Sequence, residues 1–268
     1  MLDRALKRLR DGFVSIAYPA SCHRCSRPVE SIEDGVASSP CWNDETTTQL
    51  LDSSSVCVKC GAPFLSGSVL KDFGLEAGSK LESYGRRCGV CTAARFTVAR
   101  SCGVYAGALE ANILFLKTSP HICATLRRIL IQTARRHREV LGADVITPVP
   151  LHRLRERIRG FNQAKIIARS VSEEVGSPVD DRTLLRTKHT ERHRAGMDEI
   201  DRRRSVEGAF EVVRPRRIEG ASVLLVDDVY TTGSTLISAA AALISAGAAR
   251  VNVLTIARVT PERSRLES

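Results

Sequence analysis

Short apolar runs alternate with longer segments of helical periodicity along most of the chain. The runs rich in β-branched residues lie at 143–151, 220–229 and 249–259, and the helical segments lie at 161–175 and 234–247. Strands separated by helices of this length are typical of βαβ units. The pattern therefore predicts an α/β fold in which helices flank a parallel sheet.

The hydrophobic pattern changes near residue 100. Before this point the chain is rich in Gly, Ser and Pro, contains most of its nine cysteines and has few long periodic apolar segments. We therefore expect an N-terminal helix with a cysteine-rich module at 1–100 and the α/β domain at 101–268. The first helix is predicted by an apolar stripe from Leu2 to Phe13. Packing of this helix against the cysteine-rich module is favoured over binding to a membrane surface.

Two pairs of cysteines have the spacing of zinc knuckles. They occur in the sequences CVKC and CGVC, as Cys57, Cys60, Cys88 and Cys91. Two residues between ligands allow a tight turn to direct both thiolates at one ion, and two such turns complete a tetrahedral zinc site. We expect the intervening segment to form a loop or a hairpin. The doubled spacing predicts a structural zinc ion.

A second set of cysteines lacks one ligand. Cys22 and Cys25, in the sequence CHRC, have only Cys41 as a downstream partner, and Ser38 stands where a second CxxC pair would begin. Zinc could be held by the three cysteines with His23 or water in the fourth position. A site that binds metal weakly or not at all is slightly favoured, because closed structural sites have four good ligands.

Two adjacent acids and a hydroxyl-rich turn follow an apolar run in the sequence VLLVDDVYTTGST. Asp227 and Asp228 are expected where a parallel strand reaches the ligand-binding edge of its sheet. The turn precedes an apolar helix, whose N-terminus favours an anion. A ribose 5-phosphate would satisfy both features, because its phosphate fits the turn and its vicinal hydroxyls can donate to the carboxylates. The candidate residues of the turn are Thr231, Thr232, Gly233, Ser234 and Thr235.

These thirteen residues resemble the phosphoribosyl-pyrophosphate (PRPP) motif of type I phosphoribosyltransferases. With VYAGALEANILFLK, PVPLHRLRERIRGFNQA and RRRSVEGAF in the expected order, nearly the whole chain resembles the ComF family of competence-type phosphoribosyltransferases. The resemblance implies a type I phosphoribosyltransferase-like sheet preceded by a double zinc ribbon. It also implies binding of PRPP with Mg²⁺, catalytic roles for Asp227 and Asp228, and transfer of the phosphoribosyl group to an unidentified acceptor.

Four arginines occupy alternate positions after the predicted strand ITPVP. They are Arg153, Arg155, Arg157 and Arg159. On a helix, residues at alternate positions cannot all face one site. We expect Arg157 and Arg159 to bind pyrophosphate oxygens, since they lie nearest to GFNQ and guanidinium groups bind phosphate well. The resemblance places Asn162 and Gln163 near the same cleft.

The resemblance also implies a mobile flap within the polar segment at 186–210. Two residues of this segment, His193 and Ser205, replace a Gln and an Asn that are common in the family, which weakens an assignment of substrate contacts there. Thr231 stands where purine-salvage relatives commonly have an Asp. The replacement disfavours a purine acceptor, because threonine does not supply the proton acceptor that a purine would need.

Net charge, aromatic content and apolar run length indicate the class of partner and the cellular compartment. A formal net charge of +10 favours polyanionic or phosphorylated partners, whereas an aromatic content of 4% offers little material for rows of stacking aromatics. The start of the chain lacks a signal-type apolar segment, and the longest nearly apolar run, Leu236 to Ala249, is too short to span a membrane. We therefore expect a cytoplasmic protein, in which cysteines bind metal in preference to forming disulfides.

A non-catalytic role is the alternative to an enzyme. The ComF resemblance implies a part in natural transformation. In that role the protein would bind PRPP or single-stranded DNA without turnover and would work with a helicase-like partner on incoming DNA. A third interpretation treats the cysteine-rich module as a platform for docking another protein.

Overall fold

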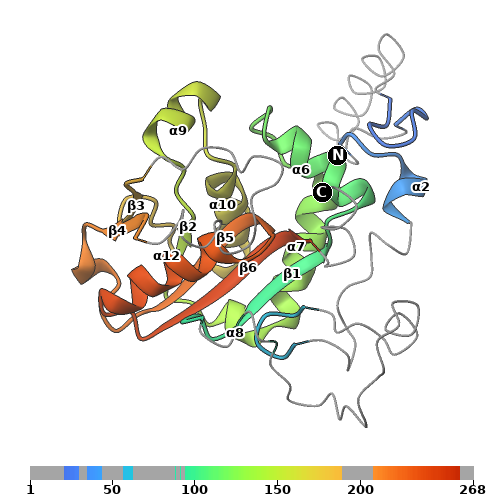
Figure 1. Ribbon diagram of the computed structural model, residues 1–268. Helices are drawn as coiled ribbons and strands as arrows, with labels where there is room; N and C mark the ends of the chain where they lie inside the picture. The colour runs from blue at the N-terminus through green and yellow to red at the C-terminus, as the bar shows by residue number, and fades with distance from the viewer. Residues whose placement is uncertain are drawn as a thin grey trace, which may run out of the picture.

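A computed structural model describes residues 21–29, 35–43, 57–62, 88, 91, 94–188 and 208–259 of the chain. Its centre is a four-stranded sheet in the order β1-β6-β5-β2, in which every neighbouring pair is parallel (Figure 1). The strands are β1 (Ala99–Val104), β2 (Val145–Pro148), β5 (Ser222–Tyr230) and β6 (Arg250–Arg258). The predicted parallel sheet is thus confirmed.

Apart from α2, which precedes β1, the helices lie between the strands in sequence, as the periodicity predicts. They are α2 (Ser39–Trp42), α6 (Gly107–Leu116), α7 (Ala124–Arg136), α8 (Arg138–Leu141), α9 (Arg153–Arg159), α10 (Gln163–Val175) and α12 (Ser234–Ser245), with a 3-10 turn at Pro215–Arg217. A separate antiparallel pair is formed by β3 (Leu184–Arg186) and β4 (Phe210–Val212). This pair lies beside α12 at the edge of the molecule in Figure 1.

Alternate residues of β5 supply two hydrophobic clusters. Leu224 and Val226 pack with residues of α6, α7 and α10, whereas Val223 and Leu225 pack with residues of α12. All four side chains are fully buried. The uninterrupted apolar run of this strand is explained by its burial on both faces, as is usual for a central parallel strand.

The two groups of cysteines pack on different faces of the sheet. Cys22 and Cys41 belong to the cluster that contains α6, and Cys57, Cys60 and Cys91 belong to the cluster that contains α12. The described parts of the cysteine-rich segment therefore share their apolar contacts with the α/β part of the chain. The predicted division at residue 100 stays a prediction about domains.

Three expectations fall on residues outside the described ranges. They concern the first helix, the segment between Cys60 and Cys88, and most of the flap with His193 and Ser205. Within the described ranges, no helix combines the length and the apolar character needed to cross a membrane.

Candidate functional site

Asp227 and Asp228 lie near the carboxyl end of β5, beyond the reach of its neighbour β2. The pairing with β2 ends at Val226, whereas the pairing with β6 continues to Tyr230. The two acids are therefore residues of the strand itself, which continues beyond the apolar run that predicts it. Their location is nevertheless the edge at which open α/β sheets bind ligands.

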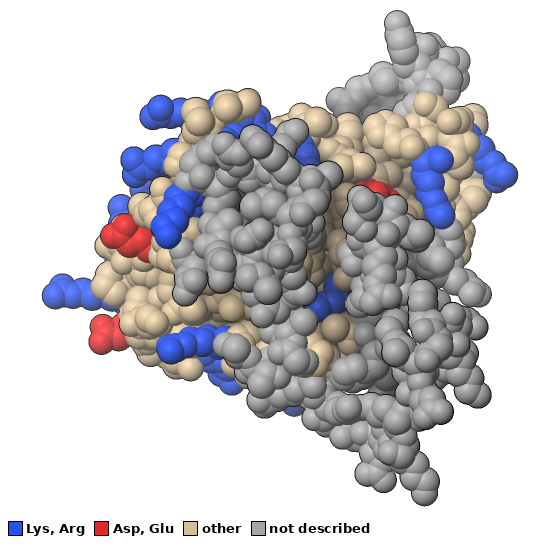
Figure 2. Space-filling view, in the orientation of Figure 1, with Lys and Arg blue, Asp and Glu red and all other residues tan. Residues whose placement is uncertain are grey.

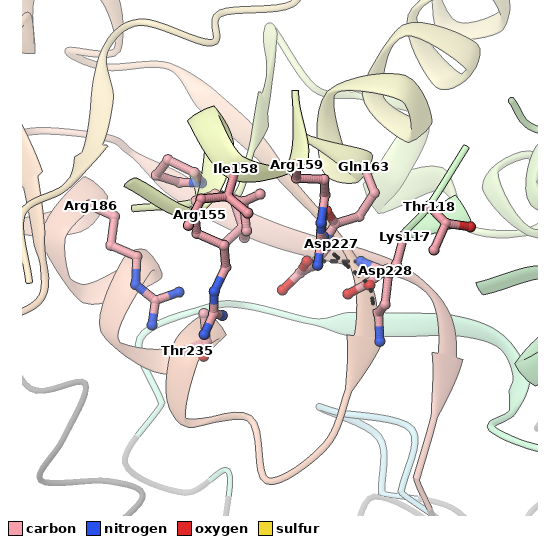
Figure 3. A pocket seen from close by; sticks show the side chains of 13 residues that line it. Lys117, Thr118, Arg155, Ile158, Arg159, Gln163, Arg186, Asp227, Asp228 and Thr235 are labelled. Atoms are coloured by element: carbon pink, nitrogen blue, oxygen red, sulfur yellow. Dashed lines mark hydrogen bonds and ion pairs between the residues drawn. The ribbon is translucent and has the colours of Figure 1, made fainter. Parts of the chain in front are cut away.

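A cavity of about 580 Å³ opens at this edge (Figure 3). Its polar lining residues are Lys117, Thr118, Arg155, Arg159, Gln163, Arg186, Asp227, Asp228 and Thr235, and its apolar ones are Val149, Pro150, Leu151 and Ile158. The cavity thus combines two carboxylates with four cationic side chains. Five of the residues that the sequence singles out meet in it, namely Asp227, Asp228, Arg159, Gln163 and Thr235.

The two carboxylates have different surroundings. Asp228 Oδ2 accepts a hydrogen bond from Gln163 Nε2 at 3.3 Å and lies 3.8 Å from Lys117 Nζ. Burial, and secondly the negative charge of Asp228, raise the pKa of the Asp227 carboxyl well above its usual range. A cation or a hydroxyl donor placed between the carboxylates would relieve this repulsion and favour the charged form of both acids.

The helical register of α9 divides its arginines between two sides. Arg155 and Arg159, four residues apart, line the cavity with the acids, and Arg159 donates to Gln163. Arg153 and Arg157 lie at a second hollow together with Glu156. Of the two arginines favoured as ligands, Arg159 thus faces the acids, whereas Arg157 does not line their cavity. Arg155 takes that place, and the four-residue spacing from Arg159 is the signal that would have identified it.

Two further cations reach the cavity from distant parts of the chain. Lys117 is the residue that caps the C-terminus of α6, and Arg186 is the last residue of β3. Burial, and secondly the positive charge of Arg155, lower the pKa of Arg186, while Asp227 acts in the opposite direction. A cavity in which Arg186 is disfavoured as a cation by its neighbour is a favourable place for an anion. Lys117 ends the segment VYAGALEANILFLK and Arg186 begins the segment expected to form the flap, but the sequence singles out neither as a ligand, because only the fold brings them to the cavity.

The turn at 231–235 leads from β5 into the twelve-residue helix α12. Gly233 caps the helix with a φ of 79°, in the left-handed region. The hydroxyl oxygens of Thr232 and Ser234 lie 2.9 Å apart, and Thr231 is exposed. Thr235 is the residue of this turn that lines the cavity. The turn therefore presents a helix N-terminus beside the acids.

Asn162 and Gln163 differ in their roles at the start of α10. The side chain of Asn162 accepts from the N–H of Ala164 at 3.0 Å and donates to the carbonyl of Val149 at 2.9 Å. Asn162 thus caps α10 and ties it to the end of β2. Gln163 alone of the two lines the cavity.

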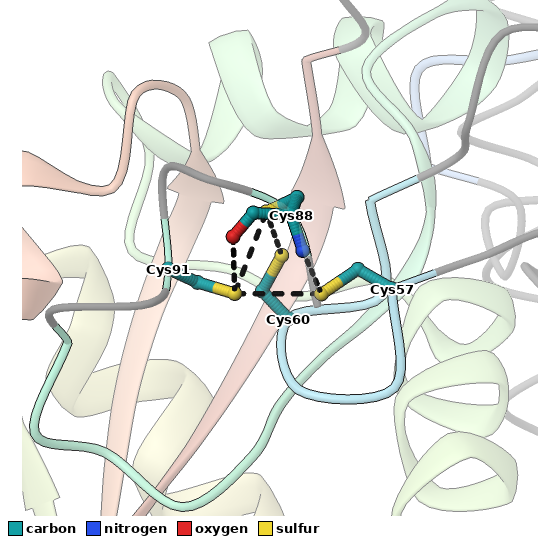
Figure 4. A group of neighbouring side chains, drawn as sticks. All are labelled: Cys57, Cys60, Cys88 and Cys91. Atoms are coloured by element: carbon teal, nitrogen blue, oxygen red, sulfur yellow. Dashed lines mark hydrogen bonds between the residues drawn. The ribbon is translucent and has the colours of Figure 1, made fainter. Parts of the chain in front are cut away.

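Four cysteine thiols come together in the arrangement that the sequence predicts (Figure 4). Cys57 and Cys91 have their sulfur atoms 3.4 Å apart, and those of Cys60 and Cys88 are 3.5 Å apart. Ligands 2.3 Å from a tetrahedral zinc ion would lie about 3.8 Å from one another, so the group fits such an ion with little adjustment. Burial acts to raise the pKa of Cys57, but backbone N–H donors outweigh it and lower the pKa to about 6.

The second cysteine group also assembles. The thiols of Cys22, Cys25 and Cys41 could together hold a metal ion, and the hydroxyl oxygen of Ser38 lies 3.3 Å from the Cys25 sulfur. The ring of His23 instead packs edge-on near Phe115, with the ring centroids 6.3 Å apart. The position that lacks a cysteine in the sequence is therefore adjacent to the thiols in space. Cys102 and Cys123 are also buried, and the Cys123 sulfur accepts from the N–H of Leu126 at the start of α7.

Comparisons with known proteins agree with this architecture. Residues 159–267 match the family model of the phosphoribosyl transferase domain. The chain is 32% identical to Competence protein F of Haemophilus influenzae over 191 residues, which cover 68% of this chain and 83% of that protein. It is 28% identical to DNA utilization protein YhgH of Salmonella typhimurium, over 91% of this chain and 99% of that protein.

A third relative matches over a shorter part of both chains. Competence protein ComFC of Bacillus subtilis is 35% identical over 115 residues, which cover 42% of this chain and 44% of that protein. The relatives, the matched domain and the cysteine groups lead to one conclusion: the chain belongs to the ComF family of competence proteins with a phosphoribosyltransferase-like domain.

Proposed function

We propose that the cavity at the end of β5 binds PRPP as its magnesium complex. The observation that carries this proposal is the meeting of two adjacent carboxylates with cations on both sides, beside the N-terminus of α12. A purely anionic ligand would be repelled by Asp227 and Asp228, and a purely cationic one by the arginines. PRPP satisfies both sets, since it carries hydroxyl donors on its ribose and negative charge on its phosphates.

The lining residues suggest which part of PRPP each of them would bind. The 5-phosphate would bind at the turn that precedes α12, and the ribose hydroxyls would donate to Asp227 and Asp228. The pyrophosphate would bind Arg155 and Arg186, whose like charges it would neutralise. Mg²⁺ bound to the pyrophosphate would supply positive charge near the acids, and oxygen ligands of this kind are those it prefers.

Transfer of the phosphoribosyl group would follow from this arrangement. A nucleophilic acceptor attacks C1 of the ribose while the C1–O bond breaks and pyrophosphate leaves with the electron pair. The carboxylates stabilise the positive charge that develops on the sugar, and the arginines stabilise the leaving group. Thr231, exposed in the turn that follows β5, offers no carboxylate to accept a proton from a purine. We therefore propose an acceptor other than a purine base.

Calorimetric titration with PRPP tests the binding proposal. The wild-type protein should bind PRPP in the presence of Mg²⁺ and more weakly after its removal. The double variant Asp227→Asn/Asp228→Asn should lose both the binding and any release of pyrophosphate. An absence of heat from the folded wild-type protein with Mg²⁺ and PRPP would refute the proposal and leave the fold unaffected.

We propose further that Cys57, Cys60, Cys88 and Cys91 hold a structural zinc ion in a reducing, cytoplasmic environment. The four converging thiols support this assignment. The three thiols beside Ser38 form a weaker site. Metal analysis of purified protein should find one tightly bound zinc ion per chain. The variants Cys57→Ser and Cys91→Ser should each lose this zinc ion.

A second candidate function is the handling of single-stranded DNA together with a helicase-like partner. The names of the relatives, which refer to competence and to DNA utilization, favour it, as does the net charge of +10. Lys and Arg side chains are also prominent on the face shown in Figure 2. Affinity for single-stranded DNA should then fall steeply with salt and survive Asp227→Asn. Binding that disappears with this substitution would assign the DNA effect to the cavity.

A further inference from the structure

A buried arginine links the four-cysteine group to the sheet. Arg258, the last residue of β6, is 5% exposed. Its Nη1 donates to the carbonyl oxygen of Cys60 at 2.8 Å, and its Nη2 lies 3.5 Å from the Cys60 sulfur. Within the described part of the chain, no carboxylate pairs with this guanidinium group. A buried cation of this kind is costly unless a negative charge lies nearby.

The metal-loaded cysteine group would supply that negative charge. Four thiolates around one divalent ion leave about two net negative charges, and outer donors to the ligand atoms commonly stabilise such sites. Arg258 already donates toward the sulfur of one of the four ligands. When the group holds no metal ion, the guanidinium group loses the charged centre toward which it donates. The position of Arg258 therefore depends on whether the cysteines hold a metal ion.

The guanidinium group of Arg258 also contacts a tyrosine at the end of β5. The guanidinium carbon lies 3.9 Å from the ring centroid of Tyr230, and the two residues are neighbours across the β5–β6 pairing. Tyr230 is almost completely buried, and its ring meets the edge of the Phe96 ring at a centroid distance of 6.4 Å. The ring is thus held between Arg258 and the segment that follows Cys91.

The hydroxyl end of Tyr230 contacts the turn that caps α12. A β-carbon at Gly233 would lie 2.4 Å from the Tyr230 hydroxyl oxygen, which shows how closely the ring approaches the backbone there. Gly233 is the central residue of the turn at 231–235 and the N-cap of α12. A shift of the ring would therefore change the direction of the backbone N–H groups that face a bound anion.

We propose that Arg258 and Tyr230 are positioning residues, which hold the turn at 231–235 in its ligand-binding conformation when the four cysteines carry a metal ion. Loss of the metal frees Arg258, loosens the Tyr230 ring and disorders the turn. Metal occupancy on one side of the molecule thereby controls anion binding at the edge of the sheet. The functional meaning of this coupling rests on the proposed binding of PRPP, but the coupling itself does not.

Hydrogen exchange on the full-length protein tests the coupling without PRPP. The backbone amides of residues 230–236 should exchange about tenfold faster after zinc is removed with a chelator, while those of β2 keep their protection. Arg258→Ala should transfer zinc to a chelator about tenfold faster than the wild type, because one ligand loses a hydrogen-bond donor. Arg258→Lys keeps the positive charge but cannot contact both the carbonyl oxygen and the sulfur of Cys60, so its rate of zinc transfer should lie between those of the wild type and Arg258→Ala.

Arg250→Ala is the matched control, because Arg250 begins the same strand, is exposed and carries the same charge. Equal exchange of the turn in zinc-loaded and zinc-free wild-type protein would overturn the proposal, and this comparison needs no variant to fold. Zinc loss at the same rate from Arg258→Ala and Arg250→Ala would overturn it too. If PRPP does not bind while exchange of the turn still follows zinc, the coupling stands and the proposed function fails.

Discussion

The two neighbouring carboxylates of the cavity have different surroundings. Asp228 has Gln163 and Lys117 as partners, whereas Asp227 has burial and the charge of Asp228 acting against its ionisation. An acid whose pKa is raised on folding binds its proton more tightly in the folded state. Its ionisation therefore lowers the free energy of unfolding as the pH rises above the pKa of the unfolded chain.

Asp227→Asn should for this reason stabilise the protein at neutral pH while it removes a residue of the binding site. The free energy of unfolding should rise because the variant removes a charge that folding disfavours, as the raised pKa of Asp227 indicates. This rise should disappear below about pH 4, where the carboxyl is protonated in both states. Urea unfolding at neutral pH and below about pH 4 measures the difference in the free energy of unfolding. A wild type that is as stable as the variant at neutral pH, or more stable, would contradict the account.

Gly233 and Gly220 both have a positive φ, but only one of them is crowded. A β-carbon at Gly233 would meet Tyr230, whereas at Gly220 it would find nothing within 4 Å. Gly220→Ala should cost about 1 kcal/mol through backbone strain alone. Gly233→Ala should cost clearly more in urea unfolding and should weaken PRPP binding. Equal costs for the two substitutions would mean that the Tyr230 contact has no energetic weight.

At the scale of single elements, the sequence predicts structure well where the signal is local. The apolar run of β5, the helix that follows the turn and the CxxC pairs are all found as predicted. Arg157 shows that proximity in sequence does not predict which side chains of a helix face a site. Proximity in sequence to GFNQ favoured Arg157, but the register of α9 brings Arg155 and Arg159 to the acids.

The N-cap of α2 offers a test of the incomplete cysteine group. Ser38 precedes this helix, is buried and lies 3.3 Å from the Cys25 sulfur. Ser38→Cys should complete a four-thiolate site and raise the tightly bound zinc from about one ion per chain to about two. Ser39→Cys adds a thiol one residue away and should leave the zinc content unchanged. An unaltered metal content in both variants would show that the group does not form a site.

At the scale of the whole molecule, the cavity depends on topology that no single segment reveals. Lys117 comes from the end of α6, Arg186 from the end of the separate β3–β4 pair and the acids from β5 of the parallel sheet, and only the fold brings them to one cavity (Figure 3). Their separation in sequence explains why sequence analysis identified the acids but neither of these cations. The cavity nevertheless lies at the sheet edge that the motif predicts.

The most direct test of the central claim compares two arginines of one helix by calorimetric titration with PRPP and Mg²⁺. Arg155 lines the cavity and Arg157 lies at the other hollow, yet both substitutions to alanine remove one positive charge from α9. Arg155→Ala should weaken PRPP binding by about 10- to 100-fold, the cost of a lost charged hydrogen bond. Arg157→Ala should bind like the wild type. Equal losses in both variants would show that PRPP is attracted by general positive charge, and unchanged binding in both would place its site elsewhere.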